Sequence, residues 1–450
     1  MLEKIFKPNQ VKKEEVDLLK WGKDWTSIKP RPLAIVFPEN EEQIIELVNY
    51  AILDNKKIVP SGGRTGLSGG ATASNGEIVL SFDRMNKILD FNYSDKLIKC
   101  QSGVITKDLQ IFASKNDLCY PVDFASSGSS QIGGNVATNA GGIRVLRYGL
   151  TRNWVVGIKI VDGKGKSMSF NNGLIKNATG YDFRHLIIGS EGTLGLITEV
   201  DINLIKKPSK QSVILLGINN SNDLVKSLEV FSKDGELSAF EFFSQPCLEK
   251  VRLHHKIIEP FAKNYKYYAL IEFDEEKQKE IEEHFGICLD RGIIEDGIIS
   301  QSLSQVNDLW ALRENISESI SHYSPYKNDI SIKVSLVPNF LEGVEALIES
   351  LHKKLQICLF GHIGDGNIHL NILKPETMEN DEFMNLTEEI TVNVYGKIAK
   401  LKGSISAEHG IGLIKKDYLE FSRTKEEIEY MKNIKDIFDP HQIFNPGKLI

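Results

Sequence analysis

The chain has 450 residues, of which 41% are hydrophobic and 26% charged, and its formal net charge is −7. This length allows two or three domains with a large core, and the acidic balance argues against a nucleic-acid partner and a basic membrane-binding surface. The five scattered cysteines form neither a C-x-x-C site nor an obvious disulfide framework, and we find neither a signal peptide nor an apolar run of about 18 residues. We therefore expect a cytoplasmic protein, with peripheral docking to the inner face of a membrane left open.

The first part of the chain alternates short strands and helices. Apolar runs predict strands over residues 34–37 and 56–59, and helical spacing predicts a helix over 41–55 with Asn40 as its N-cap. We expect further strands over 77–82 and 97–101, a helix over 106–115, and a hairpin that joins 157–161 to 166–170. Strands and helices without regular βαβ alternation indicate an α+β fold.

Residues 60–71, PSGGRTGLSGGA, hold five glycines, two serines, a threonine and Arg64. Glycines let main-chain N–H groups approach an anion closely, and the hydroxyls and Arg64 add donors. The segment follows a predicted strand but lacks the G-x-G-x-x-G and G-x-x-x-x-G-K-[ST] spacings. We therefore predict a pyrophosphate-binding loop of another type, with a flexible surface linker as the alternative.

Two more segments rich in glycine and hydroxyl side chains follow. Residues 123–149 read DFASSGSSQIGGNVATNAGGIRVLRYG, and residues 177–199 read NATGYDFRHLIIGSEGTLGLITE. Neither composition suits a regular strand or helix throughout, because glycine weakens both. Three such segments within one stretch of sequence indicate a long polar ligand that is lined along most of its length.

The motifs PSGGRTGLSGGA, GSSQIGGNVATNAGG and TGYDFRHLIIGSEGTLG resemble the three flavin-contacting segments of FAD-binding oxidoreductases of the vanillyl-alcohol oxidase type. Within that superfamily the chain is similar to the D-2-hydroxyacid dehydrogenase branch, from about Trp25 to the C-terminal FDPHQIFNPGKLI. The resemblance implies FAD, which we expect to be non-covalent because residues 60–71 and 125–149 contain no histidine or cysteine. It assigns cofactor contacts to Pro60, Ser61, Gly62, Gly63, Arg64, Thr65, Gly66, Leu67, Ser68, Gly128, Ser129, Ile132, Gly133, Gly134, Asn135, Thr138, Asn139, Gly141, Gly142, Glu191, Gly192, Gly195, Ile197 and Asn445.

The resemblance implies a two-part FAD-binding domain, an α+β substrate (cap) domain and a C-terminal helical segment. The glycine-rich character stops near Lys206, and a separate motif begins after Gly403. We predict an FAD-binding domain over 1–207 and a substrate domain over 208–402, with helices over 222–233 and 275–285 and strands over 213–217 and 267–273. A C-terminal segment over 403–450, with a helix over 425–438, completes the active site and packs on the FAD domain.

Residues 360–371, FGHIGDGNIHLN, indicate metal chemistry. Asp365 and Gly366 form the preferred two-residue hairpin loop. With this turn His362 lies directly opposite His369, so both side chains share one face with Cβ atoms about 5 Å apart, and Asn371 lands on the same face. We predict a chelating pair, with two ordinary loop histidines as the alternative.

A third ligand is available in ISAEHGIG, residues 405–412, where Glu408 precedes His409. Two histidines and one glutamate are the ligands of an open catalytic zinc or similar divalent site. In the resembling family these motif positions bind a divalent metal, and the histidine after the glutamate is the general base. The resemblance therefore implies His362, His369 and Glu408 as ligands, zinc being the first choice of metal, and His409 as the base.

An alcohol is a poor hydride donor until its proton is leaving. A divalent cation lowers the pKa of bound water from 15.7 to about 7, and we expect it to act on a coordinated hydroxyl in the same direction. A histidine, whose unperturbed pKa is about 6.5, can then take the proton while the hydride leaves C2 for flavin N5.

Residues 310–319, WALRENISES, place Arg313 and Ser317 four apart on one face of a predicted helix. A surface network of Arg313 with Glu314 or Glu318 is the alternative. The motif L-R-E-x-I-[ST] resembles the family's substrate segment, which implies that Arg313 and Ser317 hold a substrate carboxylate.

Lys327, in PYKNDISIKV, matches a lysine of the D-2-hydroxyglutarate group within the family. A second cation beside Arg313 suits a dicarboxylate, since a lone buried ammonium is costly. With Asn371, these residues complete the predicted substrate site. The chain departs from the family pattern at Lys333, where a proline is usual, and at Ser317, where threonine is commoner.

We therefore expect FAD- and metal-dependent oxidation of a D-2-hydroxy acid, with D-2-hydroxyglutarate first and D-malate next. The alternatives are a D-lactate dehydrogenase or glycolate oxidase flavoprotein subunit, a metallohydrolase whose glycine loops bind a nucleotide, and a non-catalytic FAD carrier. Quinone, electron-transfer flavoprotein and cytochrome all stay open as the electron acceptor, and a homodimer stays open as the oligomeric state.

Overall fold

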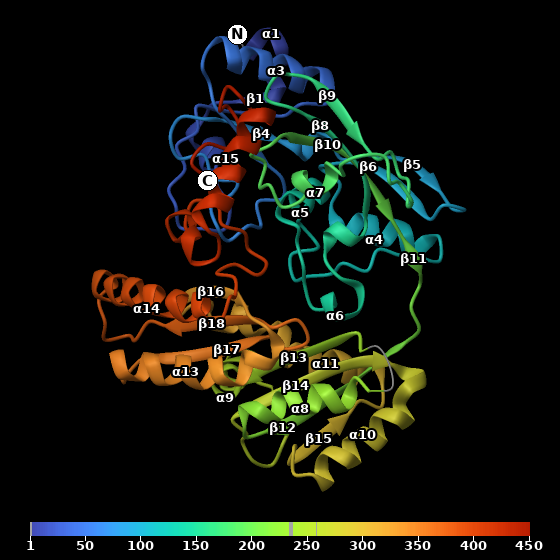
Figure 1. The fold of residues 1–450 in the computed structure, drawn as a ribbon, viewed down its shortest axis with the longest axis vertical. Coiled ribbons are helices and arrows are strands. Elements are labelled where there is room, and N and C mark those ends of the chain that lie inside the picture. The colour runs from blue at the N-terminus through green and yellow to red at the C-terminus, as the bar shows by residue number, and fades with distance from the viewer. Residues whose placement is uncertain (1, 234–236, 258) are drawn as a thin grey trace. The chain divides into compact units, whose positions relative to one another are not determined.

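The structure, a computed structural model, describes residues 2–233, 237–257 and 259–450, which form two compact units (Figure 1). Unit 1 contains Met1–Gly142, Gly149–Pro208 and Glu408–Ile450, and unit 2 contains Ile143–Tyr148 and Ser209–Ala407. The chain therefore passes from one unit to the other after residues 142, 148, 208 and 407. The domain ranges expected from the sequence stay a prediction.

Unit 1 contains a four-stranded sheet in the order β1 (Val11–Lys12), β2 (Ala34–Val36), β4 (Ile78–Ser81), β3 (Ile58–Ser61). Strands β2, β4 and β3 are parallel. Helix α3 (Glu41–Leu53) connects β2 to β3, and its N-cap Asn40 accepts a hydrogen bond from Gln43 N, as the sequence predicts. Because carboxyl ends of parallel strands meet at one edge, the first glycine segment starts at the edge where ligands bind in open α/β sheets.

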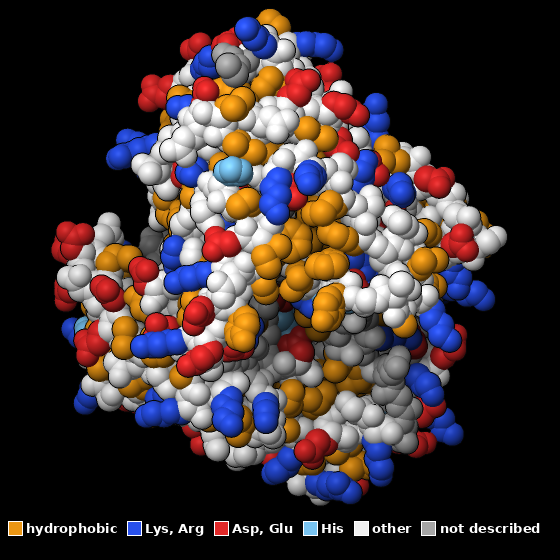
Figure 2. Space-filling view, turned by 45° about the horizontal axis from the view of Figure 1, so that its top comes forward, with side chains coloured by type: hydrophobic (Ala, Val, Ile, Leu, Met, Phe, Trp, Pro, Cys, Tyr) orange, Lys and Arg blue, Asp and Glu red, His pale blue; other side chains and the backbone are white. Residues whose placement is uncertain are grey.

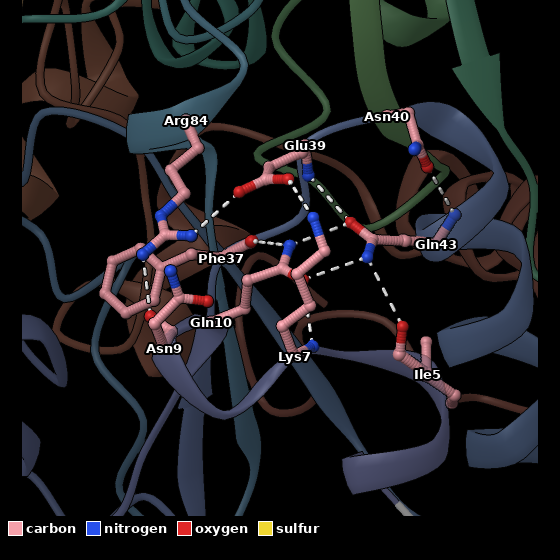
Figure 3. Close-up of polar contacts among 9 residues, drawn as sticks. All are labelled: Ile5, Lys7, Asn9, Gln10, Phe37, Glu39, Asn40, Gln43 and Arg84. Atoms are coloured by element: carbon pink, nitrogen blue, oxygen red, sulfur yellow. Dashed lines mark hydrogen bonds and ion pairs between the residues drawn. The ribbon is translucent and has the colours of Figure 1, made fainter.

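The N-terminal segment is held on this sheet by a buried glutamine (Figure 3). Gln10 is fully buried, and its Nε2 donates to Phe37 O at 2.8 Å and to Gln43 Oε1 at 2.9 Å. Gln43 Nε2 donates back to Gln10 Oε1 at 3.1 Å. Arg84 Nη1 pairs with Glu39 at 2.8 Å beside this network. A buried amide whose hydrogen-bonding groups are matched in this way fixes the position of β1 against β2.

The second sheet of unit 1 is antiparallel, in the order β5 (Ile88–Asn92), β6 (Leu97–Gln101), β10 (Leu196–Asn203), β8 (Val155–Val161), β9 (Ser167–Phe170). The β8–β9 pairing confirms the predicted hairpin. Helices α4 (Thr106–Lys115) and α5 (Ile132–Thr138) contribute apolar side chains to the core of this sheet. A small two-stranded pairing of β7 (Leu118–Cys119) with β11 (Ile205–Lys206) accompanies it.

The C-terminal tail is built into unit 1. Helix α15 (Lys425–Phe438) starts with a capping box at Thr424, and its bounds are those predicted from the sequence. Beyond it, Phe444 pairs with Ile58 of β3, and Ile443 and Phe444 are buried in the core of the parallel sheet. The last and first segments of the chain therefore share one core, and their red and blue ribbons lie side by side in Figure 1.

Unit 2 is built on a seven-stranded antiparallel sheet. Its order is β15 (Asp296–Ile299), β12 (Gln211–Ile218), β14 (Tyr267–Asp274), β13 (Ala239–Ser244), β17 (Gln356–His362), β18 (Asn367–Leu373), β16 (Tyr326–Ser331). One face packs into a core with α9 (Gln245–His255), α11 (Leu303–Glu314) and α12 (Ile316–Ser321). The unit also contains α8 (Ser221–Phe231), α10 (Gln278–Asp290), α13 (Val337–Leu351) and α14 (Asn380–Lys400).

Two local predictions in unit 2 are wrong. The turn between β17 and β18 spans four residues, 363–366, so His362 lies opposite Asn367, and His369 lies opposite Phe360. The predicted helix over 310–319 is interrupted at Asn315, which ends α11 and precedes α12.

The five cysteines are free thiols. Within the described part of the chain, no helix is both long and apolar enough to cross a membrane. Acidic and basic side chains are interspersed over the face shown in Figure 2, in agreement with the modest net charge.

Candidate active site: a flavin cavity and a polar sheet face

Unit 1 contains a cavity lined by all three glycine-rich segments. Its volume is about 890 Å³ when the space open to solvent is included, a size typical of cofactor sites. Most of the predicted cofactor residues line it: Pro60, Ser61, Gly62, Gly63, Arg64, Thr65, Gly66, Ser68, Gly133, Gly134, Asn135, Thr138, Glu191, Gly192, Gly195 and Ile197. The remaining lining residues are Asp24, Gly70, Ala71, Phe82, Gln131, Ala137 and His409.

The cavity lining fits a long polar cofactor. Three buried atoms on its wall, Asp24 Oδ2, Ser61 Oγ and Gln131 Oε1, have no hydrogen-bond partner among the described residues. Such buried atoms call for a ligand or water. A side chain at Gly134 would meet no atom within 4 Å, so the helix α5 backbone faces open space there. These observations are what a site for FAD requires.

Close backbone packing explains several of the glycines. A Cβ at Gly63 would come within 2.1 Å of Ser129 O, and a Cβ at Gly133 within 2.5 Å of Ser102 Cβ. Glycine at these positions lets the first and second segments approach each other and lets α5 approach Ser102, the residue after β6. The glycine pattern in the sequence therefore reflects packing as well as ligand contact.

Some predicted cofactor residues support the cavity instead of lining it. Asn445 is buried, and its Nδ2 donates to Gly70 O at 3.0 Å and Glu191 O at 2.6 Å, which joins the first and third segments. Ile132 belongs to the apolar core. The other predicted residues that are not among the lining residues are Leu67, Gly128, Ser129, Asn139, Gly141 and Gly142.

Glu191 fixes the backbone that follows the predicted base. Its carboxylate accepts hydrogen bonds from Ile411 N at 2.7 Å and Gly412 N at 2.8 Å. Burial raises the pKa of Glu191, although these two backbone donors and nearby lysines oppose the rise. His409, which lines the flavin cavity, lies two residues before Ile411. Glu191 therefore holds the loop that follows His409 and also lines the cavity.

In unit 2, four neighbouring strands carry polar residues on one face of the sheet. Opposed residues share a face, and every second residue along a strand shares it too. The pairs Glu241 with His362, His362 with Asn367, Asp329 with His369, and Lys327 with Asn371 therefore place eight positions on one face. These are Glu241 on β13, Phe360 and His362 on β17, Asn367, His369 and Asn371 on β18, and Lys327 and Asp329 on β16.

The two histidines remain neighbours despite the corrected register. His362 and His369 lie on the same face as diagonal neighbours, and their ring centroids are 5.4 Å apart. One ring nitrogen of His362 lies within 4.8 Å of a ring nitrogen of His369. A diagonal pair still lies within reach for long or aromatic side chains. The two histidines are therefore close to each other, as predicted. They are not the directly opposed pair that a two-residue turn would produce.

Each histidine has a buried carboxylate on the adjacent strand. His362 Nδ1 lies 2.6 Å from Glu241 Oε1, and His369 Nδ1 lies 3.6 Å from Asp329 Oδ1. In carboxylate–histidine–metal arrangements a carboxylate beside Nδ1 orients an imidazole that binds the metal through Nε2. Neither acid is part of a motif that predicts its role: Glu241 is an isolated acidic residue in the largely apolar strand β13, and Asp329 lies in the mixed strand β16.

The chain segment that precedes Glu408 is held on this polar face of unit 2. Ser404 exchanges two backbone hydrogen bonds with Ser331 of β16, and Ala407 N donates to Asp329 Oδ2 at 3.1 Å. Glu408 is the next residue, and consecutive Cα atoms are 3.8 Å apart.

Buried negative charge makes this face a suitable place for a cation. Burial raises the pKa of Asp365, in the turn between the histidines, to about 6, and the carboxylates Glu241 and Asp329 contribute to the rise. Two imidazoles and a carboxylate are a donor set typical of zinc and similar divalent ions. The residues present therefore fit a divalent metal.

Arg313 lies over the same face. Its Nη2 is 2.8 Å from Glu241 Oε2, its guanidinium lies 4.8 Å from the Phe360 ring centroid, and its Nε is buried without a hydrogen-bond partner among the described residues. Arg313 thus pairs with Glu241 rather than with Glu314 or Glu318 as the alternative supposed. Ser317 is exposed on α12, so it does not share a helical face with Arg313.

Lys327 lies opposite Asn371, which is buried. Lys327 is exposed by surface area, yet the surrounding protein desolvates its ammonium enough to lower its pKa, and no carboxylate offsets this. An ammonium in such a place would gain from an anionic ligand.

Comparison with known proteins identifies the family of the chain. Residues 32–171 match the FAD binding domain model, and residues 207–449 match the model of the C-terminal domain of FAD linked oxidases. The chain is 49% identical to the D-2-hydroxyglutarate dehydrogenase of Stutzerimonas stutzeri, with 100% of this chain and 97% of that protein covered. It is 34% identical to the mitochondrial D-2-hydroxyglutarate dehydrogenase of Danio rerio, with 99% and 82% covered.

Solved structures show the same fold at low identity. An alkyldihydroxyacetonephosphate synthase superposes with a TM-score of 0.75 at 19% identity, covering 100% of this chain and 85% of that chain. The 4-ethylphenol oxidase of Gulosibacter chungangensis superposes with a TM-score of 0.76 at 14% identity, covering 99% and 95%. With its cavity of three glycine segments and its two matching domains, the chain belongs to the FAD-linked oxidases of the vanillyl-alcohol oxidase type, in the branch of FAD-dependent D-2-hydroxyacid dehydrogenases.

Proposed function

We propose that the protein oxidises D-2-hydroxyglutarate to the 2-oxo acid with FAD and a divalent metal, zinc being the first candidate. The observation that carries this proposal is the single sheet face of unit 2. That face combines His362 and His369, each backed by a carboxylate, with Lys327, and Arg313 lies over it. Relatives at 49% and 34% identity that are named D-2-hydroxyglutarate dehydrogenase support the same substrate.

The chain supplies two cations for a substrate with two carboxylates. Among the described residues, the buried Nε of Arg313 has no hydrogen-bond partner, and no carboxylate offsets the desolvation of the Lys327 ammonium. Asn371, opposite Lys327, offers an amide for orientation. A monocarboxylate would engage one cation and leave the other desolvated, which costs binding energy. D-Malate, a shorter dicarboxylate, is the second candidate substrate.

His362, His369 and Glu408 would hold the metal, and His409 would accept the proton of the substrate hydroxyl. A bound divalent ion would make that proton more acidic, and a bound flavin would accept the hydride from C2. Glu191 holds the backbone after His409 in place through two hydrogen bonds, so the base is oriented before substrate arrives. One proton and one hydride leave the alcohol, which yields the 2-oxo acid.

Substitution of Lys327 tests the substrate assignment. We expect Lys327→Met to lower kcat/KM for D-2-hydroxyglutarate by about 100-fold, since a charged hydrogen bond to substrate contributes a few kcal/mol, and to change kcat/KM for D-lactate by less than about threefold. Lys333→Met, at an exposed lysine nearby in sequence, is the matched control. An equal loss of kcat/KM for both substrates would show that Lys327 does not bind the second carboxylate. The protein would then be better described as a D-lactate dehydrogenase or a glycolate-oxidising subunit.

A further inference from the structure

A short segment of chain belongs to unit 2 although both of its flanks belong to unit 1. This segment, Ile143–Tyr148, contains the helix α6 (Val145–Tyr148), and we name it the strap. It begins right after Gly142, a few residues beyond the cavity-lining helix α5, and the chain returns to unit 1 at Gly149. The strap is therefore bonded covalently to the flavin-lining segment at one end.

Two arginines fix the strap to strand β14. Arg144 donates through Nε and Nη2 to the two carboxylate oxygens of Glu272, at 2.8 and 3.1 Å. Arg147 donates through Nη1 and Nη2 to the two oxygens of Asp274, both at 2.9 Å, and also to Ser238 Oγ at 3.0 Å. Bidentate arginine–carboxylate pairs of this kind fix both the distance and the orientation of the guanidinium relative to the carboxylate. The hydrogen bond from Arg147 holds the pKa of Asp274 at about 2, so this pair stays charged at any working pH.

The strap reaches the substrate and metal residues through unit 2. Glu272 is buried, and its Oε2 also accepts from Trp310 Nε1 at 3.0 Å. Trp310 lies on α11, one turn before Arg313. Leu146 packs on the histidine hairpin, because a Cβ at Gly364 in its turn would come within 2.8 Å of the Leu146 side chain. Neither arginine lines the flavin cavity.

We propose that Arg144 and Arg147 are positioning residues for hydride transfer. Their ion pairs with β14 hold the strap, and with it the end of the flavin-lining segment, in a fixed position on unit 2, which also carries Arg313 and the histidine hairpin. This inference rests on the proposed function. The strap residues set the rate of the chemical step, because a misplacement of about 1 Å at the reacting atoms costs about 100-fold in rate. They do not set the affinity for FAD or for substrate.

The test measures anaerobic flavin reduction in the metal-loaded holoenzyme over a range of D-2-hydroxyglutarate concentrations. We expect Arg147→Met to lower the limiting reduction rate by at least about tenfold, with the substrate Kd and the FAD content changed by less than about twofold. Arg147→Lys should recover part of the rate, and the charge exchange R147D/D274R should recover more than either of its single substitutions. Arg252→Met, which removes a peripheral pair with Glu259, is the control and should keep the wild-type rate.

Deuterium at C2 provides a second readout of the same step. The isotope effect on flavin reduction should persist or rise in Arg147→Met, since hydride transfer itself becomes slower. A limiting rate equal to that of the wild type, or a lower rate fully explained by lost FAD or weakened substrate binding, would overturn the proposal.

Hydrogen exchange of the holoenzyme separates this inference from the proposed function. Arg147→Met should speed amide exchange in residues 135–142 of unit 1 as well as in the strap, and Arg252→Met should not. If no hydroxy acid reduces the wild-type flavin, the proposed function fails while the exchange experiment still decides the coupling. Unchanged exchange in residues 135–142 would then reject the role of the strap.

Discussion

Glu241 contacts both a proposed metal ligand, His362, and the proposed substrate arginine, Arg313. It is fully buried, with Oε1 at 2.6 Å from His362 Nδ1 and Oε2 at 2.8 Å from Arg313 Nη2. A buried carboxylate needs its polar partners, and the loss of either one leaves it incompletely paired. The acid therefore couples the orientation of the imidazole to that of the guanidinium.

Replacement of this acid should weaken metal binding. We expect Glu241→Gln to lower the affinity for zinc by 10- to 100-fold, the usual effect of losing a carboxylate behind a histidine ligand, and to lower the rate of flavin reduction. Titration of the metal-stripped protein with zinc measures the affinity, with Glu249→Gln on the exposed side of α9 as the control. An unchanged zinc affinity in a folded variant would contradict the role of Glu241.

Lys448 is a buried cation without a hydrogen-bond partner among the described residues. Burial lowers its pKa from 10.5 to about 8, although Glu77, Asp24 and Glu191 oppose this shift. Below pH 8 the lysine is charged in both folded and unfolded states, and its burial then costs about 3 kcal/mol. The cost disappears as the pH rises from about 8 to 10.5, because the folded protein releases the proton first.

We therefore expect Lys448→Met to raise the free energy of unfolding by up to about 3 kcal/mol at pH 7. The advantage over the wild type should shrink towards zero near pH 10.5. Urea unfolding at both pH values, with FAD in equal excess, measures the difference, and Lys425→Met at an exposed site is the control. A constant difference between the two proteins across this pH range would show that the charge of Lys448 is not what destabilises the fold.

At the scale of the elements, helix α5 shows how one glycine shapes the cavity. Gly133 is needed for packing against Ser102, whereas Gly134 has no atom within 4 Å of the position of a Cβ. We expect Gly134→Leu to keep the fold, since leucine is a better helix former than glycine, and to abolish flavin binding by filling the cavity. The variant should purify as a folded, colourless protein.

The control for this substitution is Gly286→Leu on α10, where a Cβ would also meet no atom within 4 Å. Circular dichroism reports the fold, and the visible spectrum reports the flavin. A Gly134→Leu protein that is yellow, and so retains flavin, would show that the cofactor does not bind against this face of α5.

Most elements could be predicted from local patterns, and the exceptions have tertiary causes. The helix over 425–438 and the hairpin of β8 and β9 follow from local signals, and both are confirmed. The two-residue turn at Asp365 and Gly366 is wrong because Gly366 O accepts a hydrogen bond from Ile332 N, which fixes a four-residue turn. Ile332 is distant from this turn in the sequence, so no local pattern around residues 363–366 indicates the hydrogen bond.

The residues of the candidate site could be predicted where their type and their motif indicate a role. Glycine segments, histidines and Glu408 form recognisable motifs, whereas nothing in the local sequence assigns a role to the side chains of Asp24, Gln131 and Glu241. These three acquire their positions through strand pairing or cavity lining. Likewise, Asn315 interrupts the helix over 310–319 between α11 and α12, so that Arg313 is placed by Glu241 and Phe360 instead of by Ser317.

At the scale of the whole molecule, the chemistry is divided between the two units. Unit 1 carries the flavin cavity with His409, and unit 2 carries the histidine pair with Lys327, with Arg313 over the same face. The chain joins them after residues 142, 148, 208 and 407, and two of these junctions, at Gly142 and Ala407, directly adjoin functional segments.

The most direct test of this account is anaerobic mixing of the purified, zinc-loaded protein with D-2-hydroxyglutarate, D-malate, D-lactate, glycolate and their L-isomers, with flavin absorbance followed over time. We predict that D-2-hydroxyglutarate bleaches the flavin fastest, that D-malate is slower, and that a chelator abolishes the reaction until zinc is returned. Faster bleaching by D-lactate or glycolate, or bleaching that no chelator affects, would contradict the proposed substrate site or the proposed metal, respectively.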